Sequence, residues 1–369
     1  MASFDEILKD CTKLGTKIPT SEYLENGKYP IIDQGQNDIA GYYDSDDGLF
    51  EDVPTIVFGD HTRVVKYVDK PCFLGADGVK LLCPVDKDIN CKYLFYQLSC
   101  ADIPNTGYNR HFKWVKALNF RIPSCDEQNH VVEVLDKVTE LISLHKQQLA
   151  KLDELVKARF VEMFGDPINN PMKWIVSKIE DIAAQEKNAL KAGPFGSALK
   201  KEFYVKSGYK IYGQEQVICG DASFGDYYID EEKYKELKNY AVQAGDILIS
   251  LVGTYGKTLI MPDNYEAGII NPRLMKITLN KNKVTPIYFK YYFESDALKA
   301  SMDANTHGGT MGILNLGIIR QMKIQVPPLS IQNQFATFVE RVAQQKQTVQ
   351  QSLEKLELMK KALMQEYFG

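Results

Sequence analysis

A chain of 369 residues is long enough for two or three domains, and 44% hydrophobic residues suffice to give each of them a core. No stretch approaches the roughly 20 uninterrupted apolar residues of a membrane span, and Met1–Glu6 lacks the basic and apolar pattern of a signal peptide. We therefore expect a folded cytoplasmic protein without a membrane partner.

Charge and cysteine spacing narrow the classes further. A formal net charge of −4 argues only weakly against a nucleic-acid-binding protein, because a local basic strip binds phosphates while acidic residues elsewhere cancel it in the total. The cysteines are odd in number, and none forms a pair at zinc or redox spacing. We expect no disulfide and no structural zinc, and reduced thiols at Cys11, Cys72, Cys83, Cys91, Cys100, Cys125 and Cys219.

Residues 1–124 have the mixed character of an α/β domain. Short apolar runs between Gly, Asp and Pro turns predict strands at Thr55–Phe58, Val64–Val68 and Val79–Leu82. Tyr93–Leu98 follows the last of these runs, and we expect it to be helical.

Residues 125–165 are predicted to form one long amphipathic helix. Apolar residues recur at alternating spacings of three and four, as in a coiled-coil seam that is interrupted at His145 and Arg159. Pro123 precedes the helix, Asp126 is the expected N-cap and Gly165 the expected C-terminal glycine. The predicted seam residues are Leu135, Val138, Ile142, Leu149, Leu152 and Val156.

Residues 166–327 form a second segment of the same mixed character but of different sequence. Strands are predicted at Ile247–Val252, Thr258–Met261 and Leu274–Leu279, and Tyr288–Phe293 is predicted to be the helix that follows them. The order of elements therefore matches that of residues 1–124.

Residues 328–369 are predicted to form a second long helix, which repeats the first. Arg121–Gly165 aligns without a gap with Gln325–Gly369, at a constant offset of 204 positions. Pro327 and Pro328 precede the second helix, and Ser330 is its expected N-cap. Lys346 and Lys360 interrupt its seam, which consists of Val339, Val342, Val349, Leu353, Leu356 and Leu363.

Each helix is expected to span 35 to 40 residues, or about 55 Å at a rise of 1.5 Å per residue. An isolated helix of this length cannot bury its apolar stripe, and the repeated copy is the natural partner. Ordinary core packing also produces such stripes, but the gapless duplication argues against that interpretation. We predict two mixed α/β (α+β) domains joined by an antiparallel coiled coil, with an internal pseudo-twofold repeat and the domains at opposite ends of the rod.

Motifs for catalysis are missing from the sequence. Gly253–Thr258 ends in Gly-Lys-Thr, but Leu251 stands where a phosphate-binding loop needs its first glycine, so we predict a glycine-rich turn. In Asn271–Arg273, arginine replaces the second proline of the Asn-Pro-Pro-aromatic loop with which methyltransferases hold a flipped base. We expect no catalytic centre and no metal site in this chain.

Two loops in each half combine basic, amide, hydroxyl, aromatic and glycine residues, a mixture suited to phosphates and base edges. Each such loop alone is more often a solvated turn, and only the two-part architecture favours DNA contact. The candidates in the first half are His61, Thr62, Arg63, Lys66, Asn105, Tyr108, Asn109, Arg110 and Lys113. Those in the second half are Lys191, Ser197, Gln214, Tyr255, Lys257, Arg273, Asn305, Thr306, His307 and Thr310.

Side-chain chemistry suggests which bases these residues read. An arginine can read guanine through two parallel hydrogen bonds, and an amide can read adenine. The guanine candidates are Arg63, Arg110 and Arg273, and the adenine candidates are Asn109, Asn305 and Gln214.

Over nearly its whole length the chain resembles the specificity subunits of type I restriction-modification enzymes. The most specific features are the Pro-x-x-x-x-Gln-Asn openings at Pro123 and Pro327, the long helices that end in Phe-Gly, and the exit from Gly165 towards Trp174. Further similar segments are Tyr29–Ile32 with Gly35–Gln36, Val57–Thr62 and Gly245–Leu248. One departure is that nothing at the N-terminus corresponds to Trp174, so this end packs differently or depends on the C-terminus.

The resemblance implies a set of partners and roles. Each target-recognition domain reads one short half-site of double-stranded DNA in successive major grooves, and the paired helices set the spacer between the half-sites. Two methyltransferase subunits, which carry S-adenosylmethionine, dock on the helices, and ATP-dependent restriction (motor) subunits join them, while this chain binds no cofactor itself. Because the two domains differ in sequence, we expect an asymmetric bipartite site.

Three alternatives stay open from the sequence. The chain could be a scaffold that brackets two protein-binding modules, in which case DNA binding would be absent or insensitive to salt. It could be an unfamiliar nuclease, which metal-dependent cleavage by the isolated chain would establish. Within the family, it could serve a system that only methylates or one that shuffles its recognition domains.

Overall fold

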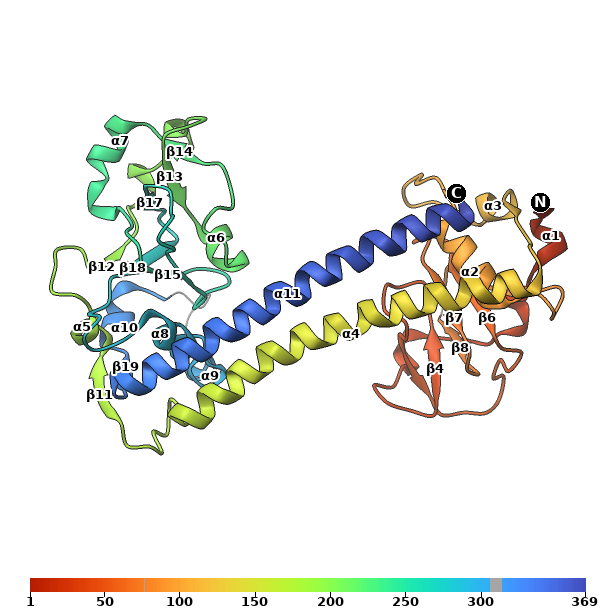
Figure 1. Ribbon diagram of the computed structural model, residues 1–369, viewed down its shortest axis with the longest axis horizontal. Helices are drawn as coiled ribbons and strands as arrows, with labels where there is room; N and C mark the ends of the chain where they lie inside the picture. Colours follow the sequence, from red (N-terminus) through yellow and green to blue (C-terminus); the bar gives the residue numbers. More distant parts are fainter. Residues whose placement is uncertain (76, 306–313) are drawn as a thin grey trace. The chain divides into compact units, whose positions relative to one another are not determined.

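The computed structural model describes residues 1–75, 77–305 and 314–369, with the side chains of residues 304 and 305 left out. The chain divides into two compact units (Figure 1). Unit 1 comprises Met1–Gln147 and Val349–Gly369, and unit 2 comprises Gln148–Thr348. The two long helices, α4 (Cys125–Phe164) and α11 (Leu329–Phe368), each contribute one part to each unit.

Unit 1 contains two four-stranded sheets and a short ribbon. The antiparallel first sheet has the order β2 (Leu8–Asp10), β9 (Val79–Pro84), β6 (Thr55–Gly59), β7 (Val65–Val68). The second sheet has the order β3 (Lys17–Ile18), β8 (Phe73–Gly75), β4 (Tyr29–Ile32), β5 (Gly41–Tyr43), and its β3–β8 and β4–β8 pairs are parallel. The ribbon pairs β1 (Ala2–Ser3) with β10 (Asn119–Phe120), and the helices before α4 are α1 (Phe4–Ile7), α2 (Cys91–Cys100) and α3 (Phe112–Lys116).

Unit 2 repeats this plan. Its four-stranded sheet has the order β12 (Leu190–Ala192), β18 (Leu274–Ile277), β15 (Ile247–Ser250), β16 (Thr258–Ile260). A three-stranded sheet has the order β14 (Tyr228–Ile229), β13 (Tyr209–Tyr212), β17 (Gly268–Ile270), and a ribbon pairs β11 (Ile175–Lys178) with β19 (Lys323–Val326). The helices are α5 (Ile179–Ile182), α6 (Gln214–Cys219), α7 (Glu231–Glu236), α8 (Pro286–Phe293), α9 (Asp296–Asn305) and α10 (Leu316–Gln321).

The pairing scheme is equivalent in the two units. In unit 1, β9 lies between β2 and β6, and in unit 2, β18 lies between β12 and β15. The parallel pair β4–β8 likewise has its counterpart in the parallel pair β13–β17. All six predicted strands and both predicted short helices are confirmed, so the duplication that the sequence reveals only in the long helices extends to both domains.

The two long helices pack antiparallel within each unit. In unit 1, Val131 and Leu135 near the start of α4 join a core with Leu363 and Phe368 near the end of α11. In unit 2, the Phe160 ring near the end of α4 lies 5.5 Å from the Phe335 ring near the start of α11. An early part of one helix thus meets a late part of the other in both units, as the coiled-coil prediction requires.

Every predicted seam residue is at least partly removed from solvent. Leu135, Val138, Ile142, Val156, Val342 and Leu353 are buried, and Leu149, Leu152, Val339, Val349, Leu356 and Leu363 are half-buried. The polar seam positions also have neighbours: Lys346 Nζ lies 2.6 Å from Asp153 Oδ1, and the Arg159 guanidinium lies over the Phe338 ring. Burial, followed by the positive charge of Lys146, lowers the pKa of Lys360. The seam therefore accommodates these cations, because Lys346 and Arg159 have partners and Lys360 stays partly exposed to water.

Both N-cap predictions are wrong by a short distance. Helix α4 begins at Cys125, and the Glu127 N–H donates to Ser124 Oγ (3.3 Å), so Ser124 takes the capping place expected for Asp126. Helix α11 begins at Leu329, directly after Pro327 and Pro328, so Ser330 lies inside its first turn and is not the N-cap. A proline fits there because the first helical turn leaves its N–H groups without helical acceptors. Gly165 closes α4 with φ +78°, as predicted.

The last phenylalanine of each long helix closes the core of one unit. The Phe164 ring meets the Tyr288 ring edge to face at 4.7 Å, and the Phe368 ring meets the Tyr93 ring in the same way at 5.2 Å. Tyr93 and Tyr288 occupy equivalent places on α2 and α8. The first domain thus depends on the C-terminal helix for part of its core, just as the second domain depends on the end of α4.

All seven cysteines are free thiols. Burial raises the pKa of Cys72, Cys83 and Cys91 to about 12, so these thiols stay protonated near neutral pH. Among the described residues, no helix is both long and apolar enough to cross a bilayer.

The repeated glutamine tethers each long helix to its domain. Gln128 Oε1 accepts the N–H of Asn90, the N-cap of α2, at 2.9 Å, and Gln128 Nε2 donates to Pro123 O at 2.9 Å. Gln332 does the same in unit 2, accepting from Thr285 N (2.8 Å) and donating to Pro327 O (2.8 Å). Both glutamine side chains are buried, and each amide bridges a backbone N–H of its domain and a backbone carbonyl beside the start of its helix.

Gln332 Nε2 also donates to Lys283 O at 2.9 Å. Replacing Gln332→Ala is expected to lower the free energy of unfolding by about 2 to 3 kcal/mol, because the Thr285 N–H and the carbonyls of Pro327 and Lys283 lose their partner. Urea unfolding measures this change. The adjacent Asn333 is exposed, so Asn333→Ala should change stability by less than about 0.5 kcal/mol. Equal effects of the two variants would contradict the tether.

Candidate DNA interface

The first predicted loop is the hairpin turn between β6 and β7 in unit 1. The buried carboxylate of Asp60 accepts the Phe112 N–H (2.8 Å), and the Asp60 N–H donates to Gly78 O (2.7 Å). Arg63 adopts a positive φ of 63°, which closes the turn before β7. Thr62 is exposed at the tip. Asp60 therefore anchors the base of the turn to the domain, and the tip at Thr62 is open to solvent.

Buried His111 lies in the second predicted loop, residues 105–113, and holds it against the first. Its Nε2 atom accepts the Thr106 N–H (3.3 Å), and its Nδ1 atom lies 2.9 Å from Asp60 O. Because Nε2 accepts, Nδ1 must carry the proton and donate to Asp60 O, which defines the neutral tautomer. The structure thus brings the two predicted loops together through His111, which belongs to the second loop but is not among the candidate DNA contacts.

An aromatic stack forms where the two loops meet. The rings of His61 and Tyr108 lie 4.8 Å apart with an angle of 9° between their planes. Tyr108 is 88% exposed, and His61 Nδ1 has no hydrogen-bond partner among the described residues. Arg110 and Lys113 are exposed on the same loop and its continuation. The surface therefore offers the exposed face of the Tyr108 ring and two cations, whereas the unpartnered His61 Nδ1 lies buried beneath it.

Five first-half candidates make hydrogen bonds within unit 1. One of them is Thr62, whose hydroxyl donates to Gln34 O (2.6 Å). Lys66 is buried and its ammonium contacts Asp33 Oδ1 (3.2 Å) and Asn37 O (2.5 Å), so the predicted DNA contact gives way to a structural one. Arg63 Nη1 donates to Ile103 O (3.0 Å) across the two loops. Asn105 Oδ1 accepts the Gly107 N–H, and Asn109 Nδ2 donates to Thr106 O. Burial and these local bonds are tertiary features that residue type does not reveal.

The predicted loops of unit 2 also converge. The Leu251 N–H donates to Arg273 O (3.0 Å), and the Gly193 N–H donates to Leu274 O (2.8 Å). A Cβ atom at Gly193 would lie 1.9 Å from Asn271 O, so only glycine permits this approach. The turn after β15, the connection from β17 to β18 and the loop after β12 therefore form one surface.

Some candidate side chains on this surface are exposed, and others are held by contacts within unit 2. Ser197, Lys257 and Arg273 are exposed, and so is Phe195, at 87%, which the candidate residues omit. Lys191 lies over the Tyr240 ring, with its ammonium 5.1 Å from the ring centre. Tyr255 donates its hydroxyl to Asp303, and Gln214 donates its amide to Val252 O. The side chain of Asn305 and all of Thr306, His307 and Thr310 lie outside the described residues.

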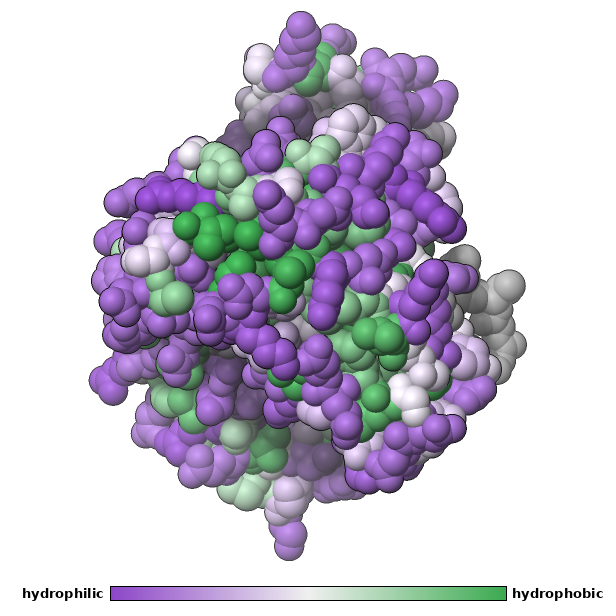
Figure 2. Space-filling model, turned by 90° about the vertical axis from the view of Figure 1, so that its right-hand side faces the viewer, coloured by the Kyte–Doolittle hydropathy of each residue, from purple (hydrophilic) through white to green (hydrophobic). Residues whose placement is uncertain are grey.

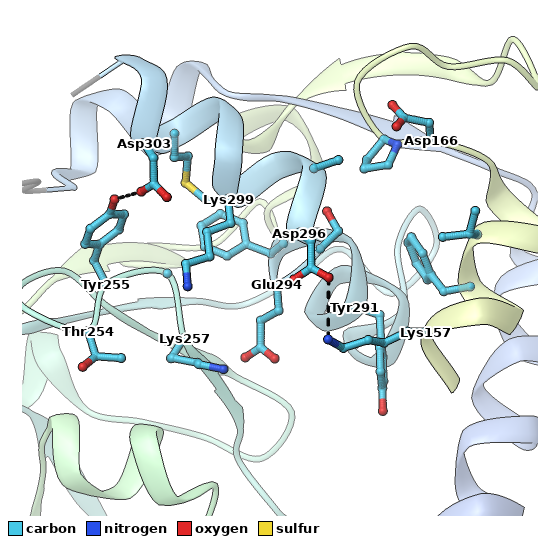
Figure 3. A pocket seen from close by; sticks show the side chains of 18 of the residues that line it. Lys157, Asp166, Thr254, Tyr255, Lys257, Tyr291, Glu294, Asp296, Lys299 and Asp303 are labelled. Atoms are coloured by element: carbon cyan, nitrogen blue, oxygen red, sulfur yellow. Dashed lines mark hydrogen bonds and ion pairs between the residues drawn. The ribbon is translucent and has the colours of Figure 1, made fainter. Parts of the chain in front are cut away.

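A cleft of about 480 Å³ opens beside the glycine-rich turn in unit 2 (Figure 3). Gly253 and Gly256 adopt φ +68° and +75°, so the segment is the predicted hairpin turn. Lys157 Nζ pairs with Asp296 at 3.6 Å, and Glu294 accepts from Thr258 and Lys290. Lys257 and Lys299 extend along the cleft without an ion pair among the described residues. Within the described ranges, no three His, Cys, Asp or Glu side chains are grouped to hold a metal ion.

Hydrophobic residues also reach the surface outside the loops. Figure 2 looks onto one side of the molecule and shows hydrophobic patches within a mostly hydrophilic surface. In unit 1 the exposed apolar residues of the long helices are Leu141, Leu144, Leu358 and Met359. Contiguous apolar patches are typical of surfaces that bind another protein, whereas singly exposed apolar side chains are common on any folded protein.

Two equivalent α/β domains, each with convergent polar loops beside paired helices, define a two-domain recognition protein. The type I restriction modification DNA specificity domain model matches residues 6–154 and 171–358, and the chain belongs to this family.

Relatives agree with this assignment. The protein named "Putative type I restriction enzyme MjaX specificity subunit" from Methanocaldococcus jannaschii is 25% identical over 203 residues, 54% of this chain and 46% of that relative. The match thus spans less than half of that relative's length.

The S subunit of a type I restriction-modification system from M. genitalium has a similar fold, with a TM-score of 0.58, 16% identity and coverage of 100% of this chain and 95% of that chain. A second chain, from a study of complex assembly and conformational transition of the type I R-M system, has a TM-score of 0.59, 14% identity and coverage of 98% and 97%.

Replacing His111→Leu is expected to release the loop of residues 104–110, because the Thr106 N–H and Asp60 O both lose a partner. Amide hydrogen exchange at Thr106 should accelerate by about tenfold, the equivalent of one hydrogen bond of roughly 1.4 kcal/mol. Hydrogen-exchange mass spectrometry measures this. His130→Leu, at an exposed position of α4, is the control and should leave the loop unchanged. The interpretation fails if both variants behave alike.

Proposed function

We propose that this chain is the DNA specificity subunit of a type I restriction-modification complex, with one half-site read by each unit. The observation that carries the proposal is that the family match covers both halves, and each half presents a convergent set of polar loops on an equivalent fold. Side chains at such loops can combine phosphate contacts with base reading.

The two units carry unlike loops, which supports an asymmetric site. Unit 1 offers His61, Tyr108 and Arg110, whereas unit 2 offers Lys257 and Arg273. Equivalent folds with different side chains place different donors and acceptors against the DNA. We therefore propose two unlike half-sites rather than an inverted repeat.

The proposed complex divides the chemistry among subunits. Methyltransferase subunits, two in number, would carry S-adenosylmethionine, and ATP- and Mg²⁺-dependent restriction subunits would complete the assembly. This chain would hold no catalytic centre, and its role would be to bind DNA and its partners. The exposed apolar residues of the helices, Leu141, Leu144, Leu358 and Met359, support a protein partner at this surface.

We further propose that α4 and α11 set the spacer between the half-sites. Each helix has 40 residues, and each pairs with the other antiparallel in both units. A paired helix is stiff, so its length translates into a separation along the DNA.

A genome-wide map of adenine methylation tests the function. Cells that express this chain with the methyltransferase subunit encoded beside it should show a new two-part asymmetric motif, which is absent with the methyltransferase subunit alone. Exchange of residues 1–124 for those of another member of the family should change one half of the motif only. Assembly of the complex without any motif would overturn the proposal in favour of a scaffold.

Insertion of four residues, close to one helical turn, after both Leu149 and Leu353 tests the role of the helices. The expected motif has a longer spacer and unchanged half-sites, and the same methylation map measures both. Insertion in only one helix is the control, since it should misalign the seam. A changed half-site would mean that the helices read bases.

A further inference from the structure

A glutamine occupies the same place in both units, two residues beyond a parallel strand. Gln34 follows Ile32, the last residue of β4, and Gln214 follows Tyr212, the last residue of β13. Ile32 pairs with Leu74 of β8, and Tyr212 pairs with Ile270 of β17, so the two strands have the same parallel register. The equivalence therefore rests on the pairing of the sheets and not on sequence similarity.

In unit 1, Gln34 holds the turn between β6 and β7 at two points. Its Oε1 atom accepts the His61 N–H (3.2 Å), and its backbone oxygen accepts the Thr62 hydroxyl (2.6 Å). A Cβ atom at Gly78, where φ is +69°, would lie 2.5 Å from both Oε1 and Nε2 of Gln34. The amide is thus confined between the turn and the Gly78 backbone.

In unit 2, Gln214 holds the equivalent turn, but with the opposite polarity. The Asp60 N–H donates to Gly78 O in unit 1, and the Leu251 N–H donates to Arg273 O in unit 2. Asp60 and Leu251 therefore have the same place in their turns. The next residues, His61 and Val252, are therefore equivalent. Gln34 accepts from the His61 N–H, whereas Gln214 Nε2 donates to Val252 O.

We infer that Gln34 and Gln214 are positioning residues that set the orientation of one DNA-reading turn in each unit. The inference rests on the proposed function, and it replaces the expectation that Gln214 reads adenine itself. The amide need not touch DNA, because it acts through the turn that presents Thr62 in unit 1 and Lys257 in unit 2. A turn released from its glutamine would lose selectivity for bases more than affinity for phosphates.

Because Gln34 accepts a hydrogen bond and Gln214 donates one, substitution by glutamate should affect the two units differently. A glutamate at position 34 keeps an oxygen that can accept the His61 N–H. A glutamate at position 214 places a carboxylate oxygen against the Val252 carbonyl oxygen, and two acceptors repel each other. The same substitution is therefore tolerated in unit 1 and disruptive in unit 2.

The test uses the complex of this chain with its methyltransferase subunit and labelled duplexes that carry the motif found by methylation mapping. Selectivity is the ratio of affinities for the intact duplex and for a duplex with one changed base in either half-site. We expect Gln34→Ala to reduce selectivity at the half-site of unit 1 by about tenfold, and Gln34→Glu to keep it within about twofold. Both Gln214→Ala and Gln214→Glu should reduce selectivity at the half-site of unit 2 by about tenfold.

Each variant has an internal control, the half-site read by the other unit. Gln36→Glu is the charge control, because Gln36 is exposed in the same loop and its side chain makes no hydrogen bond among the described residues. It should weaken binding to all duplexes alike and leave the ratio unchanged.

Several outcomes would overturn the inference. Equal losses for Gln34→Glu and Gln34→Ala, or a harmless Gln214→Glu, would contradict the opposite polarity. Loss of selectivity at both half-sites in one variant would indicate a general folding defect instead of local positioning. Full selectivity in both alanine variants removes the inference but leaves the proposed function intact, whereas a wild-type complex without any selectivity removes the proposed function as well.

Discussion

The structure depends on the burial of one long apolar seam between α4 and α11. A helix of 40 residues cannot cover its own stripe, and here each helix covers the other in both units. Because the pairing is antiparallel, the end of each helix enters the domain that precedes the other helix, where Phe164 and Phe368 complete the cores. Within each unit the seam residues and the domain core therefore pack together. The buried amide of Gln128 ties the start of α4 to unit 1, and that of Gln332 ties the start of α11 to unit 2.

The two halves of the chain are alike in their long helices and differ in the loops of their domains. The helices, their glutamine tethers and their terminal phenylalanines recur at an offset of 204 residues, since each makes the same contacts twice. The domains share their strand pairing and the helix that carries Tyr93 or Tyr288, whereas their loops differ in length and in most side chains. Such an arrangement lets the loops differ while the helices keep their contacts, because loops tolerate substitution when the scaffold below them is rigid.

Burial separates the candidate residues that stay accessible to a partner from those that do not. The two loops of unit 1 do converge, and Tyr108, Arg110 and Lys113 remain available to a partner. Lys66 was selected as a cation next to a polar loop, yet its ammonium is buried against Asp33, a residue 33 positions earlier in the chain. His111 was placed in the second loop but not given a structural role, since that role depends on its contact with Asp60, 51 residues away. Contacts over such separations follow from the sheet topology, which residue type does not encode.

The sequence by itself determined the long helices, their antiparallel pairing, and the strands rich in β-branched residues. These features follow from local periodicity and from a repeat that can be counted. It also determined the family, through motifs that lie at the helix ends. Only the tertiary structure decided that the domains are equivalent, because their likeness is in the pairing of strands and leaves little trace in the residues. It alone decided which polar side chains face outwards and which, like Gln34 and Gln214, are held inside by partners distant in the chain, since burial and hydrogen bonding arise only once the strands are assembled.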